Sequence, residues 1–554
     1  MLLLLVSLAL SAPLDDLLMS ELARAEDALS ERERTPHYIA LQVEDRTEWD
    51  LQARYGTVFS KRSDQVRYLD VDLRVGTPAL DSTHELRGFS ALDGDTRRVT
   101  DLPLSNTPGV LRHAVWKAID QQYRDADERI VLVRANQQVK VEEEETAPDF
   151  TVVPDPRIDD IVRDSPVIDL DAWQPILVEI SQLLDSSELV RASSVDLGVE
   201  HVIKTFVDSE DSRLSHDWTH GRLSMTASTT ADDGDVVGVY EAIDVHDPSS
   251  LPDREALLRT ARAVVERVEA LHAAPRGEPY SGPVLLMGRA TGVFFHEVLG
   301  HRVEGHRQKR EDEGHTFADH VGRSVLPEWI DVYDDPTIPV LAGTDLNGHY
   351  TYDDEGMRAQ RAEIVENGEF QGFLMGRSPI QGFDSSNGHG RRSVGNAPVS
   401  RMGNTIIEAS ETVPFEMLKQ GLRDQAREQD LEYGILVESI DGGFTLTGRQ
   451  MPNAFNVRAS ASWRVFADGR PDELVRGIDL VGTPFGAFSS IIAAGENPEV
   501  FNGFCGAESG WVPVSAVAPP MLFERLEFQL KEKAQERPPL LAKPHPTTAA
   551  GGES

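Results

Sequence analysis

The first half of the chain mixes helical and extended hydrophobic patterns. Leu17, Leu18, Leu22 and Ala25 recur along one face of a helix that the sequence predicts over residues 16–34. Three further helices are predicted, over residues 112–130, 171–185 and 253–273. Runs of β-type residues separate them, at 38–44, 53–62, 66–76, 190–208, 222–230 and 235–245. This order favours an α+β region in which helices pack against an antiparallel sheet.

The second half is richer in strands. A strand over residues 283–288 runs into an apolar helix that carries His296, and β-type runs with glycine-rich turns dominate beyond it. One later helix is predicted over residues 414–429. The chain is therefore predicted to be a two-domain α+β protein, with an N-terminal and middle region at 13–280 and a β-rich C-terminal domain at 281–530 that carries the histidine helix.

Both ends of the chain differ from its middle. Residues 1–12 hold an apolar run from Leu2 to Leu10 and then two small residues, which resembles a signal peptide, although no Lys or Arg precedes the run. Export to the periplasm is therefore slightly favoured over a cytoplasmic location. No other stretch approaches the roughly 20 apolar residues of a membrane span. Residues 531–554 cannot bury enough apolar surface to fold alone and are predicted to be disordered.

Composition narrows the partners and the covalent chemistry. The 554 residues carry a formal net charge of -39. A chain this acidic repels phosphate backbones, so nucleic acid is not expected as a partner. The single cysteine, Cys505, excludes an intramolecular disulfide and leaves either a small buried thiol or a metal ligand.

The segment FFHEVLGHRVEGH, which starts at Phe294, holds two histidines around a glutamate. His296 and His301 are five residues apart, whereas the helix of zinc peptidases places its histidines four apart. Residues five apart lie roughly 140° apart around a regular helix, so the pair needs a distorted turn to bind one ion. A π-bulge would provide such a distortion, and Gly300 would make it easier. A catalytic zinc also needs a third protein ligand, for which composition leaves three candidates: Glu304, His306 and Cys505.

Other histidine pairs lack these companions. His216 and His220 are four residues apart, but the Ser, Asp, Thr and Gly residues around them predict a turn and not a metal-binding helix. His315 and His320 repeat the five-residue spacing without a glutamate after the first histidine. We interpret both pairs as structural or surface residues.

Several segments of the second half resemble the TldD branch of the TldD/PmbA (TldE) family of metallopeptidases. GRATGVFFHEVLGHRVEGH is similar to the HExxxH segment of that branch. The resemblance continues, in the expected order, through the DDEG-type turn region at 352–377, the glycine- and arginine-rich stretch at 387–408 and the Cys-Gly segment at 477–528. Together these segments cover most of residues 283–528, whereas the first half resembles the family less closely.

The resemblance implies a zinc site with a general base. Members of the TldD branch bind zinc through the two histidines of the motif and the cysteine of the C-terminal segment, which correspond here to His296, His301 and Cys505. Glu297 takes the role of the base. The family assembles as dimers around an enclosed site, which implies a homodimer or a heterodimer with a TldE-like subunit, and a peptide or unfolded polypeptide as substrate.

Other residues in the matched segments are expected to support this site. Glu304 is expected next to the ligands, with His306 as a minor competitor for the metal. Four further residues are expected to form turns and ion pairs, in preference to contacting substrate: Asp354, Arg391, Arg392 and Asn404. Two positions depart from the family pattern: His306 stands where relatives often carry Asp, and Ala507-Glu508 where they carry Gly-Lys. We expect Glu508 to lie near the cleft and to alter substrate preference.

The implied function is a zinc-dependent metallopeptidase that hydrolyses peptide bonds in small peptides or unfolded segments, inside a chamber formed by a dimer. The alternative is a non-catalytic, chamber-forming subunit of a TldD/TldE-type complex that keeps a structural metal. The presence of Glu297 beside a complete set of ligands speaks against the alternative. An iron oxygenase is disfavoured, because a thiolate and a base glutamate suit zinc hydrolysis better.

Overall fold

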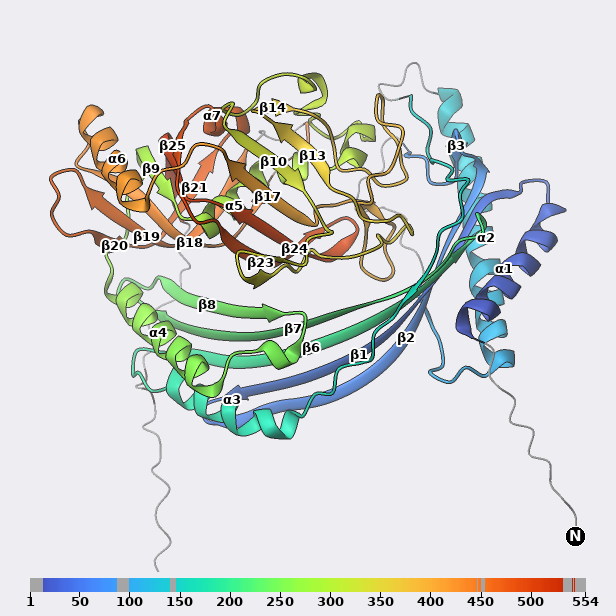
Figure 1. The fold of residues 1–554 in the computed structure, drawn as a ribbon, viewed down its shortest axis with the longest axis horizontal. Coiled ribbons are helices and arrows are strands. Elements are labelled where there is room, and N and C mark those ends of the chain that lie inside the picture. The colour runs from blue at the N-terminus through green and yellow to red at the C-terminus, as the bar shows by residue number, and fades with distance from the viewer. Residues whose placement is uncertain are drawn as a thin grey trace, which may run out of the picture.

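The computed structural model describes residues 13–86, 99–139, 146–445, 447–449, 454–531, 541 and 543. The expected signal segment, 1–12, and most of the predicted disordered tail lie outside the described residues. Within them, a long curved sheet from the N-terminal half lies against a β-rich C-terminal half (Figure 1). The α+β class predicted from the sequence is confirmed.

The N-terminal sheet is built on one long hairpin. Strands β1 (Pro36–Arg54) and β2 (Thr57–Thr77) pair antiparallel along their length and turn at Tyr55 and Gly56, which both have the positive φ of a tight hairpin turn. The prediction of three short strands here is wrong. Residues 45–50 also pair, because β1 is flanked by β2 on one side and by β6 (Ala192–Asp208) on the other. These residues are only half-buried, so they do not alternate clearly between apolar and polar types.

The sheet continues through β7 (Arg213–Thr230) and β8 (Val236–Val245). Short strands complete it, namely β3 (Leu80–Asp81), β4 (Thr100–Asp101) and β5 (Ile158–Ile161). Because β7 is continuous, His216 and His220 lie in extended backbone, and the turn predicted for them is wrong. Both histidines lie on one face of the strand, since residues four apart in a strand point the same way.

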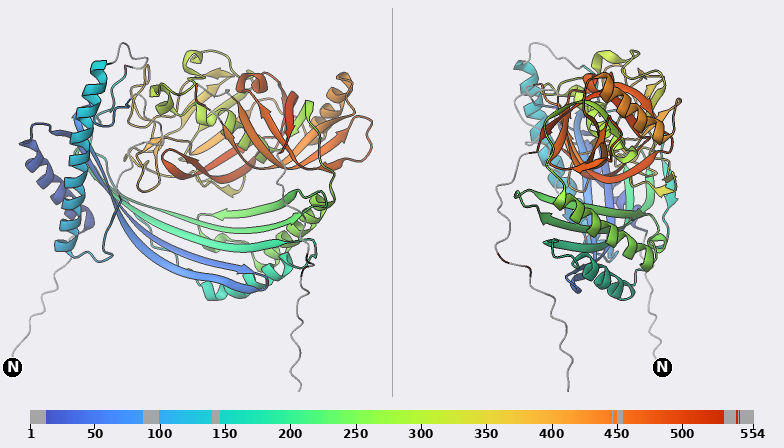
Figure 2. Two further views of the ribbon diagram at one scale, coloured as in Figure 1. Left: turned by 180° about the vertical axis from the view of Figure 1, so that it is seen from behind. Right: turned by 90° about the vertical axis from the view of Figure 1, so that its left-hand side faces the viewer.

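Helices cover the sheet at its two ends. Each overlaps a predicted helix: α1 (Leu14–Ser30), α2 (Pro108–Val139), α3 (Leu170–Leu184) and α4 (Arg254–Ala273). Helices α3 and α4 lie on the convex face, whereas α1 and α2 lie at the opposite end (Figures 1 and 2). Asp169 and Asp253 cap the starts of α3 and α4 by accepting hydrogen bonds from first-turn N–H groups. Leu177 and Ile180 of α3 then share a core with Val264 of α4.

The C-terminal half contains an open sheet with the order β14–β13–β10–β17–β24–β23. Its strands are β10 (Ile330–Asp334), β13 (Ala362–Glu366), β14 (Glu369–Phe370), β17 (Asn404–Ala409), β23 (Glu499–Ala507) and β24 (Gly510–Ala518). Strands β23 and β24 form a hairpin, and β23 lies at the edge of the sheet. Shorter pairs lie beside it: β11 (Val340–Leu341) with β12 (Thr344–Asp345), and β15 (Gly390–Arg391) with β16 (Val399–Ser400).

A second C-terminal sheet closes into a ring, because β18 pairs with both β9 and β19. The ring consists of β9 (Tyr280–Leu286), β18 (Tyr433–Thr445), β19 (Phe455–Phe466), β21 (Ile478–Gly482) and β25 (Met521–Leu530). Attached to it are β20 (Glu473–Val475), β22 (Ile491–Ala494), α6 (Phe415–Glu428) and α7 (Pro484–Phe488). Helix α6 matches the predicted helix 414–429. Helix α5 (Gly288–Val298) follows β9 and packs against β18 and β24, between the ring and the open sheet.

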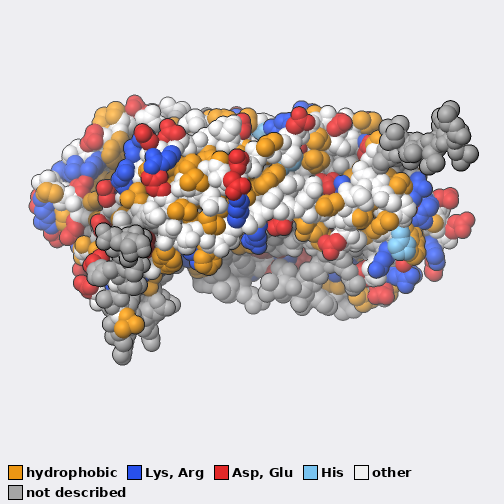
Figure 3. Space-filling view, turned by 90° about the horizontal axis from the view of Figure 1, so that it is seen from below, with side chains coloured by type: hydrophobic (Ala, Val, Ile, Leu, Met, Phe, Trp, Pro, Cys, Tyr) orange, Lys and Arg blue, Asp and Glu red, His pale blue; other side chains and the backbone are white. Residues whose placement is uncertain are grey.

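The face of the N-terminal half that carries α3 and α4 is charged but balanced. Figure 3 shows acidic and basic side chains interspersed on this face. One such pair joins the two helices, with Arg254 Nε 2.6 Å from Glu179 Oε2. None of the described helices combines the length and the apolar character that crossing a membrane requires.

Arg377 joins the two halves of the molecule. Its guanidinium is fully buried and donates to Glu210 Oε1 at 2.6 Å and to the hydroxyl of Tyr38 at 3.1 Å. It also donates to the carbonyl of Thr151 and lies 4.1 Å from the ring centroid of Phe150. A single side chain of the C-terminal half therefore contacts several segments of the N-terminal half.

Replacing Arg377 with methionine keeps the volume of the side chain but leaves Glu210 without this cation. We expect Arg377→Met to lower the free energy of unfolding, measured by urea denaturation, by about 2–4 kcal/mol. Arg361→Met breaks the exposed ion pair with Glu363 and should cost less than about 1 kcal/mol. Equal losses in the two variants would contradict the role given to Arg377.

Candidate metal centre

Helix α5 lies unusually close to strand β24. A Cβ atom at Gly288 would lie 2.5 Å from the carbonyl oxygen of Ala518, and one at Gly292 would lie 3.1 Å from the Cβ of Ala516. Glycine is needed at the first position, because a side chain there would overlap backbone that cannot move aside. The other side of the helix packs into the ring, where Phe294 meets Phe455 with ring centroids 5.5 Å apart. The helix is thus held against the hairpin that carries the only cysteine of the chain.

The helix ends before it reaches the second histidine. Its last residue is Val298, and Gly300–Arg302 forms a 3₁₀ turn in which Arg302 N–H donates to the Leu299 carbonyl at 2.9 Å. The distorted turn that the spacing requires is therefore present, but as a 3₁₀ turn and not as a π-bulge, because the helix stops instead of widening. Gly300 contributes by its small size: a Cβ atom there would lie 2.1 Å from the sulfur of Met402. The change of direction at Leu299 brings His301 beside His296, with ring centroids 5.1 Å apart.

Three predicted ligands converge at this turn. His296 Nε2 lies 3.2 Å from Cys505 Sγ, and His301 Nε2 lies 3.4 Å from the same sulfur. The donor atoms of the three residues all lie within 4.8 Å of one another. Each of these residues is less than a tenth exposed. The remaining nitrogen of His296, Nδ1, is buried and has no hydrogen-bond partner among the described residues.

The three groups also shift one another's pKa values. Burial alone would raise the pKa of the Cys505 thiol, but His301 and His296 hold this pKa well below its usual value. Burial alone would lower the pKa of His296, but the neighbouring sulfur raises it. The two histidines thus favour the thiolate form of Cys505, which is the form that binds metal.

The donor set and its spacing fit zinc. Bonds of about 2.0–2.1 Å to nitrogen and about 2.3 Å to sulfur place the donors of a tetrahedral site roughly 3.3–3.6 Å apart. The nitrogen–sulfur distances of 3.2 Å and 3.4 Å agree with this spacing within a few tenths of an ångström. Two imidazoles and a thiolate are ligands that zinc favours, and three protein ligands leave a fourth position for water.

Glu297 lies directly after the first of these residues, in the last turn of α5. Its side chain rests against Gly443 of β18, where a Cβ atom would lie 2.8 Å from Glu297 Cγ. Its backbone carbonyl accepts a hydrogen bond of 2.9 Å from Arg302 Nη1. The carboxylate is buried, and the strand next to it carries no side chain at the point of contact. Its charge is close enough to act on His296, whose pKa it helps to raise after the larger effect of Cys505.

Glu304 connects His301 to two arginines that the sequence analysis missed. Its Oε2 lies 3.2 Å from His301 Nδ1 and 2.9 Å from Arg307 Nε. Its Oε1 lies 3.2 Å from Arg401 Nε, and Arg401 also donates to the backbone carbonyl of Cys505 at 2.8 Å. Burial alone would raise the pKa of Glu304, but His301 and both arginines hold it far below the usual carboxyl value. Arg307 directly follows the HExxxH segment, and Arg401 lies in the stretch 387–408. Their place in the segments that resemble the family is the only feature of the sequence that could have identified them.

The two departures from the family pattern meet in space. His306 Nε2 lies 2.5 Å from Glu508 Oε1, and Arg307 Nη2 lies 3.3 Å from Glu508 Oε2. The family pattern has an aspartate at the position of His306 and a lysine at the position of Glu508. In this chain a histidine and a glutamate take those places and form the pair. The expectation that Glu508 faces substrate gains no support, because its carboxylate is engaged by its own chain. His306 faces this carboxylate and is not part of the group formed by the three ligands.

The remaining predicted residues make their contacts outside the metal centre. Asp354 pairs with Lys204 of the N-terminal sheet at 2.5 Å and accepts a hydrogen bond from the backbone of Arg392. The Arg392 guanidinium pairs with Asp70 of β2. Asn404 Nδ2 donates to the carbonyls of residues 335 and 338 and so holds a loop. Arg391 lines a cavity between the two halves of the molecule.

The chain is similar to proteins named as metalloproteases. Residues 279–530 match the family model of the PmbA/TldA metallopeptidase C-terminal domain. A metalloprotease of Methanothermobacter thermautotrophicus is 28% identical over 346 residues, which are 60% of this chain and 70% of that protein. A protein of Saccharolobus solfataricus named as a zinc metalloprotease TldD homolog is 24% identical over 352 residues, 61% of this chain and 71% of that protein. The crystal structure of TldE from Thermococcus kodakarensis has the same fold, with a TM-score of 0.60, 16% identity, and coverage of 92% of this chain and 99% of that one.

The contact between His306 and Glu508 predicts a compensating pair of substitutions. Glu508→Lys should lower the free energy of unfolding by about 3–5 kcal/mol, because it places a cation against Arg307. Adding His306→Asp restores opposite charges, in the family's order, and should recover more than half of that loss. Urea denaturation of both single variants and the double variant measures the coupling. Glu411→Lys, at an exposed acid, is the control and should change the value by less than about 0.5 kcal/mol. Strictly additive effects at residues 306 and 508 would contradict the pairing.

Proposed function

The chain is a member of the TldD/PmbA family, and from this premise we propose that it is a zinc-dependent metallopeptidase of the TldD-like, HExxxH-bearing branch. The observation that carries the proposal is the convergence of His296, His301 and Cys505, which come from a helix, a 3₁₀ turn and a strand more than 200 residues away. Glu297 follows the first ligand directly. The names of the relatives support a protease role in general.

Each residue of the centre has a distinct part in peptide hydrolysis. Bound zinc would supply Lewis acidity, which polarises a carbonyl and lowers the pKa of water. Glu297 accepts the proton of the attacking water on its carboxylate and donates it to the leaving nitrogen. Glu304 contacts His301 Nδ1 and thereby keeps His301 Nε2 directed at the sulfur. Arg401 fixes the backbone of Cys505.

The burial of the centre restricts the substrate. The two histidines and the cysteine are each less than a tenth exposed, and Glu297 is buried beside them. A folded protein cannot bring a peptide bond to groups covered in this way. We therefore propose small peptides or unfolded segments as substrates, bound in an extended form.

We further propose that the chain works as a dimer, either with a second copy or with a TldE-like subunit. Its similarity to the TldE of Thermococcus kodakarensis over 92% of the chain supports such a partner. A dimer would enclose the centre further. The non-catalytic alternative retains the metal and the partner but has no use for a base at Glu297, so this residue separates the two functions.

Substitution of the base and of the sulfur ligand should have different effects. Glu297→Gln should keep zinc but reduce peptide hydrolysis by about 10²–10⁴-fold, because the proton acceptor is lost. Cys505→Ser should lose zinc and activity together. Metal content by mass spectrometry and cleavage of an unstructured peptide library measure both effects. His113→Gln, at an exposed histidine of α2, is the matched control and should change neither quantity.

Normal hydrolysis by Glu297→Gln would contradict the mechanism. A zinc-loaded wild-type chain that cleaves no peptide, alone or with a TldE-like partner, would favour the non-catalytic alternative. Zinc retained by Cys505→Ser at wild-type affinity would remove the cysteine from the ligand set.

A further inference from the structure

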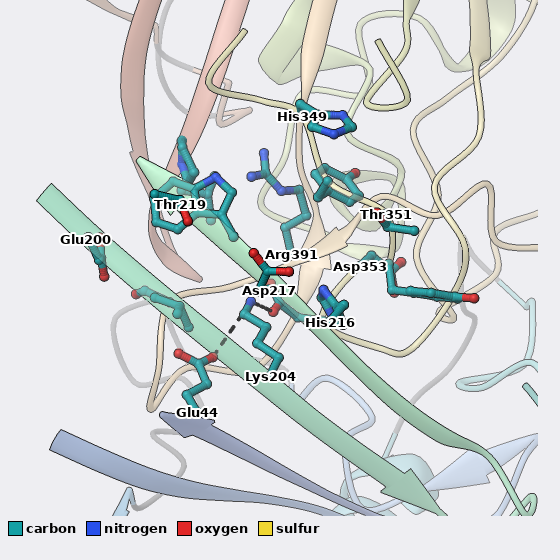
Figure 4. A pocket seen from close by; sticks show the side chains of 18 of the residues that line it. Glu44, Glu200, Lys204, His216, Asp217, Thr219, His349, Thr351, Asp353 and Arg391 are labelled. Carbon is teal, nitrogen blue, oxygen red and sulfur yellow. Dashed lines mark hydrogen bonds and ion pairs between the residues drawn. The ribbon is translucent and has the colours of Figure 1, made fainter. Parts of the chain in front are cut away.

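A cavity of about 460 Å³ lies between the N-terminal sheet and the C-terminal half (Figure 4). Its floor is formed by β1, β6 and β7, and its other walls by the loop around residues 349–354, by β15 and by the hairpin of β23 and β24. The volume is within the range of about 300–1,000 Å³ that is typical of sites for small ligands. Neither part of the chain forms the cavity alone.

The cavity is separate from the metal centre. Phe504 and Cys505 are neighbours on β23 and point to opposite faces of the strand. Phe504 lines the cavity, whereas the sulfur of Cys505 faces the histidines of the metal centre. Neither of those histidines lines the cavity, and nor does Glu297. The hairpin therefore forms a wall between two distinct sites.

Most charges in the walls of the cavity are already paired. The basic residues pair as follows: Arg46 with Glu200, Arg163 with Asp217, Lys204 with Asp354, and Arg392 with Asp70. Of the remaining acids, Glu44 accepts a hydrogen bond from Gln42 and lies 3.7 Å from Lys204. Asp353 accepts hydrogen bonds from the backbone N–H groups of residues 355, 357 and 390. Burial and the neighbouring Glu355 also raise the pKa of Asp353, which makes it a weak counter-ion.

Arg391 is the exception. Its side chain is 6% exposed, and Nη1 donates to the carbonyl of Met402 at 2.5 Å. No carboxylate of the described residues pairs with it, and its other N–H groups have no acceptor there. Figure 4 shows the side chain extending into the cavity between the segments of Thr219 and His349. None of its nitrogens is among the buried polar atoms that lack a partner, so those without an acceptor open into the cavity, where a carboxylate can bind them through two parallel N–H groups.

Aromatic side chains also line the cavity. Tyr350 lies under the Arg391 guanidinium, with its ring centroid at 4.7 Å, and Trp218 lines the floor. Phe504 and Trp511 extend from the hairpin and remain 38% and 68% exposed, unusual fractions for such large apolar side chains. A ligand that carries both an anion and an apolar group would cover these rings and neutralise the guanidinium at once.

We propose that this cavity binds a carboxylate attached to an aromatic or large apolar group, as at the C-terminal residue of a peptide, with Arg391 as its anion-binding residue. The site lies beyond the proposed metal centre and does not depend on hydrolysis. Both a peptide end and a free acylated amino acid carry this chemistry. The two sources differ only in what extends from the mouth of the cavity beside Trp511.

Calorimetric titration tests the proposal on the full chain carrying Glu297→Gln, so that added peptides stay intact. The probes are N-acetylphenylalanine, its neutral amide and the tripeptide Ala-Ala-Phe. We expect the acid to bind at least about tenfold more tightly than the amide, since an ion-paired hydrogen bond is lost in the amide. Tighter binding of Ala-Ala-Phe than of the single residue would identify peptide ends as the ligand, and the reverse would identify the free acid.

Two variants distinguish a specific contact with Arg391 from a general effect of positive charge. Arg391→Gln should weaken binding of the acid at least about tenfold and leave binding of the amide nearly unchanged. Arg163→Gln, at a 70% exposed arginine on the rim, is the matched control and should change either affinity less than about threefold. Equal affinity for acid and amide in the parent chain, or no heat with any probe at millimolar concentration, would overturn the proposal even if Arg391→Gln failed to fold. The titrations measure binding and not hydrolysis. Absence of carboxylate binding would therefore leave the peptidase proposal intact, and absence of peptidase activity would leave the binding proposal intact.

Discussion

The close contact between helix α5 and strand β24 is the constraint on which the candidate metal centre depends. Gly288 and Gly292 let the helix approach the strand until backbone and Cβ atoms touch. The helix carries His296, and the hairpin of β24 and β23 carries Cys505. The distance between these two donors is therefore fixed by backbone packing and not by flexible side chains. A site built on such rigid elements is preorganised, which is what tight and selective metal binding requires.

Around this contact the charges are arranged in alternating shells. The imidazole of His301 meets Glu304, which meets Arg307 and Arg401, and Arg307 in turn meets Glu508 and Glu313. Each buried charge thus has an opposite charge next to it, which offsets the cost of removing it from water. The same contacts tie residues 300–313 to the hairpin. The candidate ligands, which are far apart in the sequence, are consequently connected by one network of ion pairs and hydrogen bonds. Loss of one of these charges would alter the electrostatic environment of the Cys505 sulfur.

The sequence predicted the helices well, because their apolar residues repeat with the period of a helix. It predicted the length of β1 and β2 poorly, since the half-buried centre of a strand shows no clear alternation. A π-bulge would require α5 to continue to His301, whereas the helix stops where Gly300 packs against Met402. The sequence did not reveal this contact, because Met402 lies about a hundred residues further along the chain. Composition left the third ligand open, and only the family resemblance pointed to Cys505. His306 and Glu508 looked like two independent departures, because their contact exists only in the fold.

The hairpin of β23 and β24 also separates the candidate metal centre from the cavity. On its Cys505 face, every residue of the metal centre falls within 279–530, the part that matches the family model. On its Phe504 face, the cavity needs β1, β6 and β7, which lie outside that match. The candidate metal centre therefore lies in the part of the chain that matches the family model, whereas the cavity combines walls from that part with a floor from outside it. A difference in ligand between this chain and its relatives can thus arise without any change at the metal centre, as residues on β6 and β7 are replaced. The two faces remain coupled through one short strand, because any shift of Phe504 moves the peptide group to which Cys505 is attached.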